Sequence, residues 1–390
     1  MTYEQSVSFL YDLQFFGIKL GLENVKRFFE HAECLTFKQK LVHIAGTNGK
    51  GSTATMVASI AGAHGLNVGV YTSPHILDFR ERIRVSGNMI SEDAVVSFVQ
   101  TYKSYILEHK LTFFEVTTVM AVHYFISQNV DLIVLETGMG GRLDATNCFI
   151  PDVCVITNVS MDHQSYLGDT LEQITSEKCG IIKKNIPVIC ASQRDVVTCM
   201  VREKANELDA PFIHIVQDEM VCEFNQTIYH TSLIGEHQKL NMKTALTACS
   251  KLFRIIPEKA KHALTHIKWP GRLETWEKDH RVILDVSHNP EGVEQTVRTL
   301  ESEYPNEKFI IVYSFLDDKD KQANLTLLQT IAKQFYFYPF ENKRLLNQET
   351  YESIYPKELS IQQFLDAHKP YRALVIGSHY LLDAFLKDNM

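Results

Sequence analysis

The segment Leu41–Thr53, with the sequence LVHIAGTNGKGST, constrains the fold of this chain more than any other. A short apolar run predicts a buried strand, a loop with three glycines and one lysine follows, and a helical pattern extends from Ser52 to Gly65. Glycines let backbone N–H groups face a phosphate, and the N-terminus of a helix adds the positive end of its dipole. The segment therefore predicts a phosphate-binding loop between a strand and a helix.

The loop departs from the Walker pattern, in which Ser or Thr directly follows the lysine and a glycine opens the loop. Here Gly51 follows Lys50, and Ile44 stands where the first glycine would be. A glycine-rich turn between a strand and a helix can also be purely structural. Lys50 and the hydroxyl groups of Ser52 and Thr53 favour binding of a nucleotide triphosphate and Mg²⁺ over that alternative.

Composition narrows the class of protein. The chain has 390 residues, which suits two or three domains, and 45% hydrophobic with 22% charged residues is ordinary for a globular protein. The net charge of -8 argues against non-specific binding to nucleic acid or to an anionic membrane. ATP and other anionic ligands would therefore require a local concentration of positive charge.

Cysteine usage and hydropathy indicate the compartment. The eight cysteines are scattered and form no CxxC pair, so we expect reduced thiols, neither a disulfide framework nor a zinc site. The first residues lack the pattern of a secretory signal, and no apolar run approaches the length of a membrane span. We therefore expect a cytoplasmic protein that has no membrane partner.

Predicted strands alternate with predicted helices through the first two thirds of the chain. After the phosphate loop, strands are predicted at 67–71, 131–135, 152–156 and 187–191, and helices at 91–108, 113–128 and 171–184. This alternation is typical of a parallel sheet with helices on both faces. Four strands end in polar or glycine-rich loops, at Gly46, Thr72, Glu136 and Asn158, and these loops could converge on one site.

A second series of strands begins after Trp269–Arg272. Before it, the pattern predicts a hairpin at 222–234 and a helix from His237. After it, strands are predicted at 282–285, 308–313, 334–338 and 372–376, with helices between them. We therefore predict a first domain at 1–268 and a smaller α/β domain at 269–390.

Three positions in the first domain could carry chemistry. Glu136 directly follows an apolar strand, where a Mg²⁺ ligand would sit, although a solvated carboxylate is the commoner case. Asp162 and His163 follow the next strand, but Mg²⁺ prefers oxygen, and such a pair is most often an ordinary loop feature. Lys178 lies in a predicted helix, where a solvated or snorkelling lysine is the ordinary expectation.

In the second domain, Asp285 ends a strand and His288 follows it. Asn289 and Pro290 then open a helix, so Asn289 could serve simply as its cap. Arg272 follows Pro-Gly and could hold a phosphate through two parallel hydrogen bonds, or could equally lie on the surface.

Taken together, the motifs resemble the folylpolyglutamate synthase/dihydrofolate synthase family, a branch of the Mur ligase superfamily. They run in the family's order from about residue 17 to about residue 320, and the match thins beyond that point. The matching segments are GTNGKGS, TSPHILDFRERIRV, ETGMGGRLDATN, ITNVSMDH, LGDTLEQITSEKCGII, PGRLE and LDVSHNPEG.

The resemblance implies an α/β fold, with a P-loop Mur-ligase-type ATP-binding domain, a smaller Rossmann-like C-terminal domain, and ATP in the cleft between them. It implies an ATP-dependent carboxylate–amine ligase. ATP would phosphorylate a carboxylate of dihydropteroate or of a reduced folate, and the amine of L-glutamate would displace the phosphate as the amide forms. The enzyme would act in folate biosynthesis and polyglutamylation, and we expect a monomer.

The resemblance also assigns roles to individual residues. ATP would be held by Asn48, Gly49, Lys50, Gly51, Ser52, Asn241, Arg272 and Asp285. The magnesium ligands would be Ser73, Glu136 and His163. Lys178 matches a lysine that is carbamylated in the family, and it would act in catalysis with Lys50 and His288.

Pterin recognition would use Lys19, Leu20, Gly21, Thr112, Phe113, Phe114, Glu115, Leu143 and Asp144. Phe113 and Phe114 offer an aromatic face to a flat ring and Glu115 offers an acceptor, although adjacent phenylalanines at a helix start usually pack in the core. Lys19 matches some members that only extend polyglutamate, whereas GRLDATN favours dihydrofolate synthase activity.

Three alternatives stay open at this point. A Mur-type ligase could join a different carboxylate to a different amino acid. An ATP-binding module could have lost catalysis, although Lys50, Glu136, His163 and Lys178 are all present. A P-loop kinase would leave the second domain unexplained.

Overall fold

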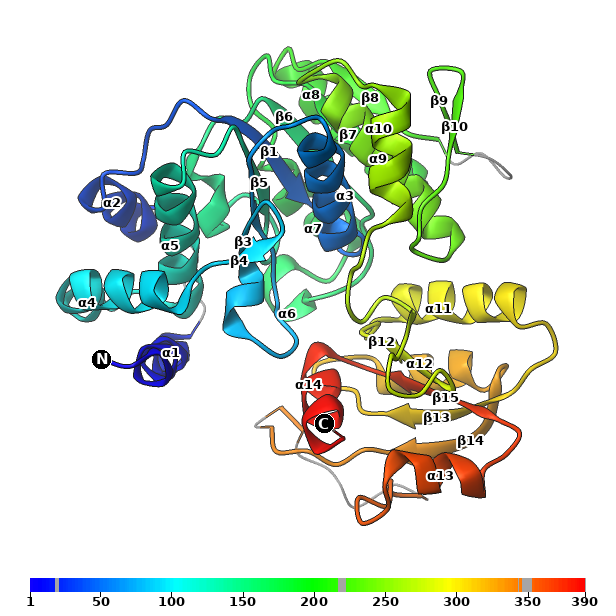
Figure 1. The fold of residues 1–390 in the computed structure, drawn as a ribbon. Helices are drawn as coiled ribbons and strands as arrows, with labels where there is room; N and C mark the ends of the chain where they lie inside the picture. Colours follow the sequence, from blue (N-terminus) through cyan, green and yellow to red (C-terminus); the bar gives the residue numbers. More distant parts are fainter. Residues whose placement is uncertain (18–20, 217–221, 343, 346–352, 390) are drawn as a thin grey trace. The chain divides into compact units, whose positions relative to one another are not determined.

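A computed structural model describes residues 1–17, 21–216, 222–342, 344–345 and 353–389 of the chain. It divides into two compact units, which are described separately (Figure 1). The first unit comprises Met1–Thr231 and Lys239–Ile267, and the second comprises Ser232–Gln238 and Lys268–Met390.

The first unit is built on an eight-stranded sheet with the strand order β4-β3-β2-β5-β1-β6-β7-β8. In this order, the neighbouring strands β2, β5, β1, β6, β7 and β8 all pair in parallel. At the other edge, β3 pairs antiparallel with β2, and β4 pairs antiparallel with β3. The bounds are β1 (Lys40–Ala45), β2 (Val68–Tyr71), β3 (Ile83–Val85), β4 (Asn88–Met89), β5 (Leu132–Glu136), β6 (Val153–Ile156), β7 (Val188–Cys190) and β8 (Phe212–His214). The predicted parallel sheet is confirmed.

Helices of the first unit are α1 (Tyr3–Asp12), α2 (Glu23–His31), α3 (Lys50–Ala63), α4 (Glu92–Glu108), α5 (Phe113–Ser127), α6 (Gln164–Leu167), α7 (Leu171–Cys179), α8 (Asp195–Glu207) and α10 (Pro257–Thr265). Helix α9 (Glu236–Ser250) begins in the segment that belongs to the second unit. The 3₁₀ turns are η1 (Leu13–Phe16), η2 (Phe79–Arg82) and η3 (Ala145–Cys148), and β9 (Cys222–Phe224) and β10 (Thr227–Tyr229) form the predicted hairpin.

Alternation along β1 assigns its side chains to two faces. Leu41 belongs to the apolar cluster that includes residues of α5, and Ala45 to the cluster that includes residues of α7 and α8. Because successive side chains of a strand point to opposite faces, Val42 and Ile44 lie on the other face, and α3 contacts both β1 and α10. The sheet is therefore covered on both faces, as a parallel sheet requires.

Two predicted helices differ from the structure by two or more residues at an end. Helix α7 ends at Cys179 rather than at residue 184, because Gly180 packs directly against the backbone of Arg142. Helix α3 begins at Lys50, two residues earlier than predicted, and ends at Ala63. The earlier start matters because it places the lysine itself in the first turn of the helix.

The second unit contains a five-stranded sheet with the order β11-β12-β15-β13-β14, in which only β11 runs antiparallel to its neighbour. Its bounds are β11 (Glu274–Thr275), β12 (Val282–Asp285), β13 (Phe309–Tyr313), β14 (Ala332–Phe337), β15 (Arg372–Ile376), α11 (Pro290–Glu303), α12 (Lys321–Leu328), α13 (Ile361–Ala367) and α14 (His379–Asp388). The predicted second α/β series is confirmed.

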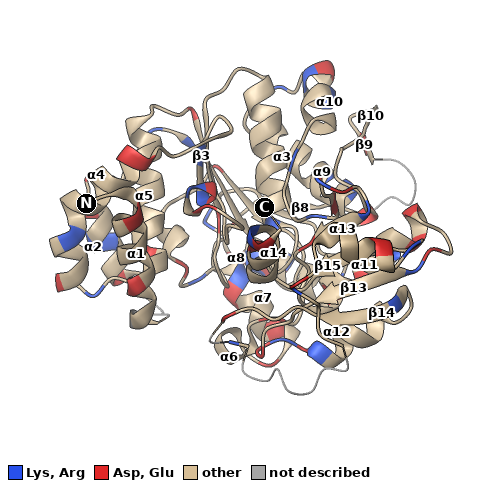
Figure 2. Cartoon of the chain, turned by 60° about the horizontal axis from the view of Figure 1, so that its bottom comes forward, with Lys and Arg blue, Asp and Glu red and all other residues tan. Residues whose placement is uncertain are grey.

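Charged side chains of both signs are interspersed along the helices of each unit (Figure 2). Within the described ranges, no helix has the length and apolarity that crossing a membrane would require.

The packing of α5 on β2 gives a test of the fold. A Cβ atom on Gly69 would lie 2.6 Å from the ring of Phe125, which is fully buried. We expect Gly69→Ala to lower the free energy of unfolding by about 1–3 kcal/mol, because the ring has to move inside a packed core. Urea unfolding followed by circular dichroism measures this change.

Gly62→Ala is the matched control, because nothing lies within 4 Å of a Cβ atom built at this helical position. Its free energy of unfolding should stay within about 1 kcal/mol of the parent value or rise slightly. Equal unfolding midpoints for the two variants would contradict the packing described here.

Candidate active site

The carboxyl ends of β2, β5, β1 and β6 lie level with one another. Residue Ile44 of β1 is paired with Glu136 of β5, and Ala45 is paired with Ile156 of β6. Tyr71 of β2 is paired with Leu135. The predicted convergence of the strand-end loops is therefore confirmed, since each loop emerges at the same edge of the sheet.

The phosphate loop is held tightly between two other segments of the first unit. Gly49 caps helix α3 with φ +86°, and a Cβ atom there would lie 2.5 Å from Asn241 Oδ1. The Thr47 N–H donates to the Asn158 carbonyl at 2.6 Å, and Thr157 Oγ1 donates to the Asn48 carbonyl at 2.8 Å. Neighbouring backbone therefore fixes the curvature of the loop.

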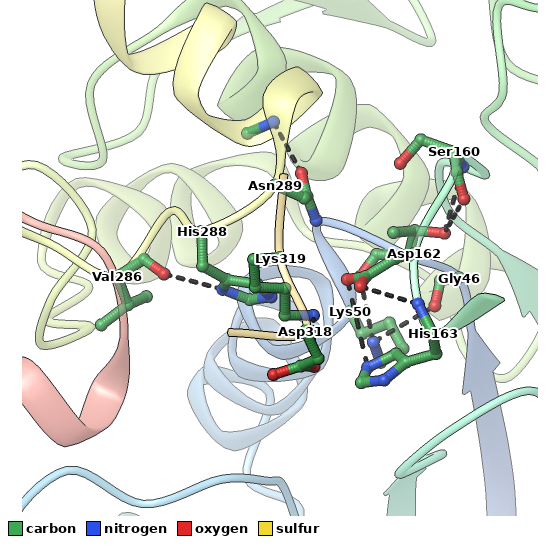
Figure 3. Close-up of polar contacts among 12 residues, drawn as sticks. Gly46, Lys50, Ser160, Asp162, His163, Val286, His288, Asn289, Asp318 and Lys319 are labelled. Atoms are coloured by element: carbon green, nitrogen blue, oxygen red, sulfur yellow. Dashed lines mark hydrogen bonds and ion pairs between the residues drawn. The ribbon is translucent and has the colours of Figure 1, made fainter. Parts of the chain in front are cut away.

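Lys50 folds back over its own loop (Figure 3). Its Nζ donates to the carbonyls of Gly46 at 3.2 Å and Thr47 at 3.1 Å, and lies 4.0 Å from Glu136 Oε1. Gly51, Ser52 and Thr53 follow in the first turn of α3 and are buried. The ammonium group thus lies between the phosphate loop and the carboxylate at the end of β5.

Glu136 is 4% exposed, and its Oε2 accepts the backbone N–H of Ser73 at 3.1 Å. The structure therefore brings Ser73, Glu136 and Lys50 together from three strand ends. Asn241 of α9 lies beside the same loop, where its Oδ1 accepts the Thr53 hydroxyl at 3.4 Å.

Lys178 is 3% exposed, and its Nζ donates to the Gly46 carbonyl at 2.8 Å. Burial, and then the nearby Lys50 ammonium, lower the pKa of Lys178 to about 7, while Asp162 and Asp144 act in the opposite direction. The expectation of a solvated lysine, drawn from the local sequence, was wrong. Cys179 and Ile181 beside it were the only local signal of burial.

His163 opens helix α6 in the left-handed conformation, with φ +51°. The backbone N–H of His163 donates to Asp162 Oδ1 at 2.8 Å, and its ring Nε2 lies 4.0 Å from Asp162 Oδ2. Figure 3 draws these two residues side by side. The His163 side chain is 37% exposed, whereas that of Asp162 is largely buried.

Asp144 organises the glycine-rich loop that follows β5. Its Oδ2 accepts the backbone N–H groups of Gly138 at 2.9 Å and Met139 at 3.0 Å, and its Oδ1 accepts the Thr146 hydroxyl at 2.6 Å. Burial raises the pKa of Asp144, and these hydrogen bonds oppose the shift. Asp144 therefore has a structural role in this loop, and its contact with a pterin stays a prediction. The preceding residue, Leu143, is half-buried.

The other predicted pterin residues lie at the start of α5. Thr112 and Glu115 form a capping box in which Glu115 Oε2 accepts the Thr112 N–H at 2.7 Å. Phe113 and Phe114 are both partly buried against the core, and the Phe114 ring lies over Gly138. Gly21 has φ +143°, whereas Lys19 and Leu20 lie outside the described residues.

Sequence reasoning missed a cluster around Phe113. The Arg82 guanidinium lies 5.1 Å from the Phe113 ring centre, and Arg82 Nε donates to His75 Nδ1 at 2.7 Å. Because an arginine can only donate, His75 Nδ1 must be an acceptor, so Nε2 carries the proton that faces Tyr11 Oη at 3.0 Å. The available signal was the position of His75 in the loop after β2, two residues beyond Ser73.

In the second unit, Asp285 stabilises the turns around it. Its two oxygens accept the N–H groups of Leu273 at 3.0 Å and Ser287 at 2.9 Å, so it fixes the chain next to Arg272. His288 Nδ1 bonds to the Val286 carbonyl at 2.9 Å (Figure 3). Asn289 caps α11, which is the structural role that the sequence allowed for it.

Comparison with known proteins identifies the family. The Mur ligase middle domain matches residues 44–249, and the Mur ligase glutamate ligase domain matches residues 271–369. The dihydrofolate synthase/folylpolyglutamate synthase of Bacillus subtilis is 34% identical, over 88% of this chain and 86% of that protein. The chain belongs to the dihydrofolate synthase/folylpolyglutamate synthase family.

Solved structures of this family have the same fold. Folylpolyglutamate synthase from Thermotoga maritima has a TM-score of 0.83 at 29% identity, covering 99% of this chain and 96% of that chain. E. coli FolC in complex with DHPP and ADP has a TM-score of 0.85 at 28% identity, covering 98% of this chain and 97% of that chain. The resemblance seen in the sequence motifs is thus confirmed.

The buried Lys178 predicts a dependence of stability on pH. Its pKa is about 7 in the folded chain and higher when unfolded, so between these values the unfolded chain binds more protons. The free energy of unfolding of the parent, minus that of a Lys178→Met variant, should therefore rise from pH 7 to about pH 10 and stay constant below pH 7. Urea midpoints of both proteins in carbon-dioxide-free buffer measure the difference, and a pH-independent difference would contradict the burial.

Proposed function

We propose that this chain is an ATP-dependent ligase that adds L-glutamate to dihydropteroate, to the γ-carboxylate of a reduced folate, or to both. The observation that carries the proposal is the convergence of Lys50, Glu136 and Lys178 on one edge of the sheet. Each comes from a different strand-end loop or helix, as expected for a site that serves phosphoryl transfer. The family relationship supports the same activity.

The first step transfers the γ-phosphoryl group of ATP to the acceptor carboxylate, so that a new O–P bond forms and ADP leaves. Transfer of this kind depends on positioning and on charge neutralisation more than on covalent help from the protein. Asn48, Gly49, Gly51 and Ser52 would hold the phosphates through backbone N–H groups and a hydroxyl. Lys50 would leave its present carbonyl partners and neutralise the transferred group.

The second step forms the amide. The neutral amine of L-glutamate attacks the carbonyl carbon of the acyl phosphate, the C–O bond to phosphate breaks, and the amine loses its proton. His288, Arg272 and Asp285 of the second unit are proposed to act on the nucleotide and its phosphates, in line with the sequence prediction.

The donor set at Glu136 suits Mg²⁺. Among the described residues, no three His, Cys, Asp or Glu side chains gather into a metal-binding group. One buried carboxylate, which accepts the Ser73 N–H, nevertheless fits this ion, because Mg²⁺ usually takes few protein ligands and completes its shell with phosphate and water. Ser73, Glu136 and His163 would hold it, and when bound it would neutralise charge on the phosphates.

Lys178 is proposed to carry a carbamate. Its amine, buried beside the Lys50 ammonium, would add to carbon dioxide with formation of an N–C bond and release of one proton. The low pKa supports this, because only a neutral amine can react. The product is an anion at a position where the local sequence shows only a cation, and it would stabilise either a metal or the attacking amine.

The acceptor is proposed to lie against the start of α5. The ring of Phe113 stacks on that of Tyr11, with 5.8 Å between centroids, and the Arg82 guanidinium lies over it. A flat pterin ring bound there would therefore lie beside other aromatic side chains. Thr112, Phe114, Glu115, Leu143 and Asp144 would complete the pterin contacts, together with residues 19–21. A monomeric state and a cytoplasmic location stay predictions.

One assay tests the activity directly. Glutamate-dependent release of ADP should be measured with dihydropteroate and with 5,10-methylenetetrahydrofolate side by side. We expect turnover with at least one of these acceptors and none without glutamate. Turnover only with an unrelated carboxylate would instead support the Mur-type alternative, and ATP binding without any turnover would support a module that has lost catalysis.

Lys50→Met should lower kcat by roughly 100-fold or more, because an ammonium that stabilises the transferred phosphoryl group is lost. Lys251→Met, at an exposed position after α9, is the matched control and should leave kcat unchanged. Steady-state ADP release measures both. A Lys50→Met enzyme as active as the control would remove Lys50 from the mechanism.

A further inference from the structure

The loop after β5 is in direct contact with the end of helix α7, which carries Lys178. The Arg142 N–H donates to the Glu177 carbonyl at 2.7 Å. The Asn147 side chain donates from Nδ2 to two carbonyls, that of Arg142 at 3.0 Å and that of Gly180 at 3.1 Å. One asparagine therefore joins both backbones.

No side chain separates the two segments. A Cβ atom on Gly141 would lie 2.9 Å from each of the carbonyl oxygens of Glu177 and Lys178, and a Cβ atom on Gly180 would lie 2.3 Å from Arg142 Cβ. The backbone around Lys178 thus rests directly on the loop. A shift of the loop by even a fraction of an ångström has to move the main chain at Lys178.

Hydrogen bonds of Asp144 connect the loop from the end of β5 to Asn147. Asp144 Oδ2 holds the N–H groups of Gly138 and Met139, and the Asn147 N–H donates to the Asp144 carbonyl at 2.8 Å. Asn147 is 6% exposed. Because carbonyl oxygens only accept hydrogen bonds, its amide nitrogen must face them, which fixes the orientation of the side chain.

A second contact across the same junction is weaker. The Arg142 guanidinium pairs with the Glu177 carboxylate at 2.7 Å, but the arginine side chain is 56% exposed. Ion pairs this open to water contribute little. The buried Asn147 amide is therefore the side chain that holds the junction.

We propose that Asn147 is a positioning residue for Lys178. It ties the loop that begins at Glu136 to the end of α7, and so fixes the Lys178 amine at 2.8 Å from the Gly46 carbonyl of the phosphate loop. The effect of an Asn147 substitution on turnover rests on the proposed function of Lys178. Its effect on the position of the Lys178 amine does not depend on that function.

Asn147→Asp and Asn147→Ala test the proposal. The aspartate has the same shape but turns a carboxylate toward two carbonyl oxygens, and the alanine removes both hydrogen bonds without adding charge. We expect kcat to fall roughly tenfold, and further in the Asp variant, with the KM values for ATP and acceptor within about twofold of the parent. Loss of overall structure would instead change both parameters and the unfolding midpoint.

Asn67→Asp is the matched control. Asn67 lies just before β2, at the amino end of the sheet, and its Nδ2 donates to the Gln128 carbonyl at 3.2 Å. We expect its kcat to equal that of the parent. If the Asp variant at position 147 does not fold, the uncharged Ala variant decides the outcome.

Crystal structures of the variants at position 147 give the readout that does not depend on activity. We expect Lys178 Nζ to move out of hydrogen-bonding distance of the Gly46 carbonyl. An unmoved Nζ in both variants, or kcat within twofold of the parent in both, overturns the proposal. If the parent shows no ligase activity at all, the proposed function fails, and the position of Nζ alone then decides whether Asn147 positions Lys178.

Discussion

Two lysine side chains converge on one backbone carbonyl, that of Gly46. Lys178 approaches it from α7 at 2.8 Å and Lys50 from α3 at 3.2 Å. Burial, and then the neighbouring Lys50 ammonium, lower the pKa of Lys178 to about 7. A lowered pKa of this kind is what the proposed carbamate on Lys178 would require.

The sheet makes this convergence possible. Strands β2, β5, β1 and β6 are neighbours although they are far apart in the sequence, and each contributes one loop to the same edge. Glu136 is therefore adjacent to both Ser73 and Lys50. The carboxylate would be costly to bury alone, and the N–H group and ammonium around it offset that cost.

The sequence predicted the loops of the site better than the burial of its side chains. The strand-end loops were predictable, because glycines, prolines and apolar runs report local backbone geometry. Burial of Lys178 was not, since it depends on the loop at 138–147, which lies far away in the sequence. The structural roles of Asp144 and Glu115 were not predictable either. A carboxylate in either position could contact a ligand, or could make the loop and helix-cap hydrogen bonds that the structure shows. Family resemblance supplied Lys178, which local pattern had assigned to solvent.

The contact between Gly141 and α7 limits where the enzyme can change. Gly141 and Gly180 leave no room for a Cβ atom at this junction, so a larger residue at either position would have to displace the backbone next to Lys178. The start of α5 is different. Phe113 has side chains on several sides and is only partly buried, so its side chain can be exchanged without the backbone clash that a Cβ atom would cause at Gly141. If the acceptor lies there, as proposed, substitutions that change acceptor preference belong at the start of α5, with Gly141 and Gly180 left intact.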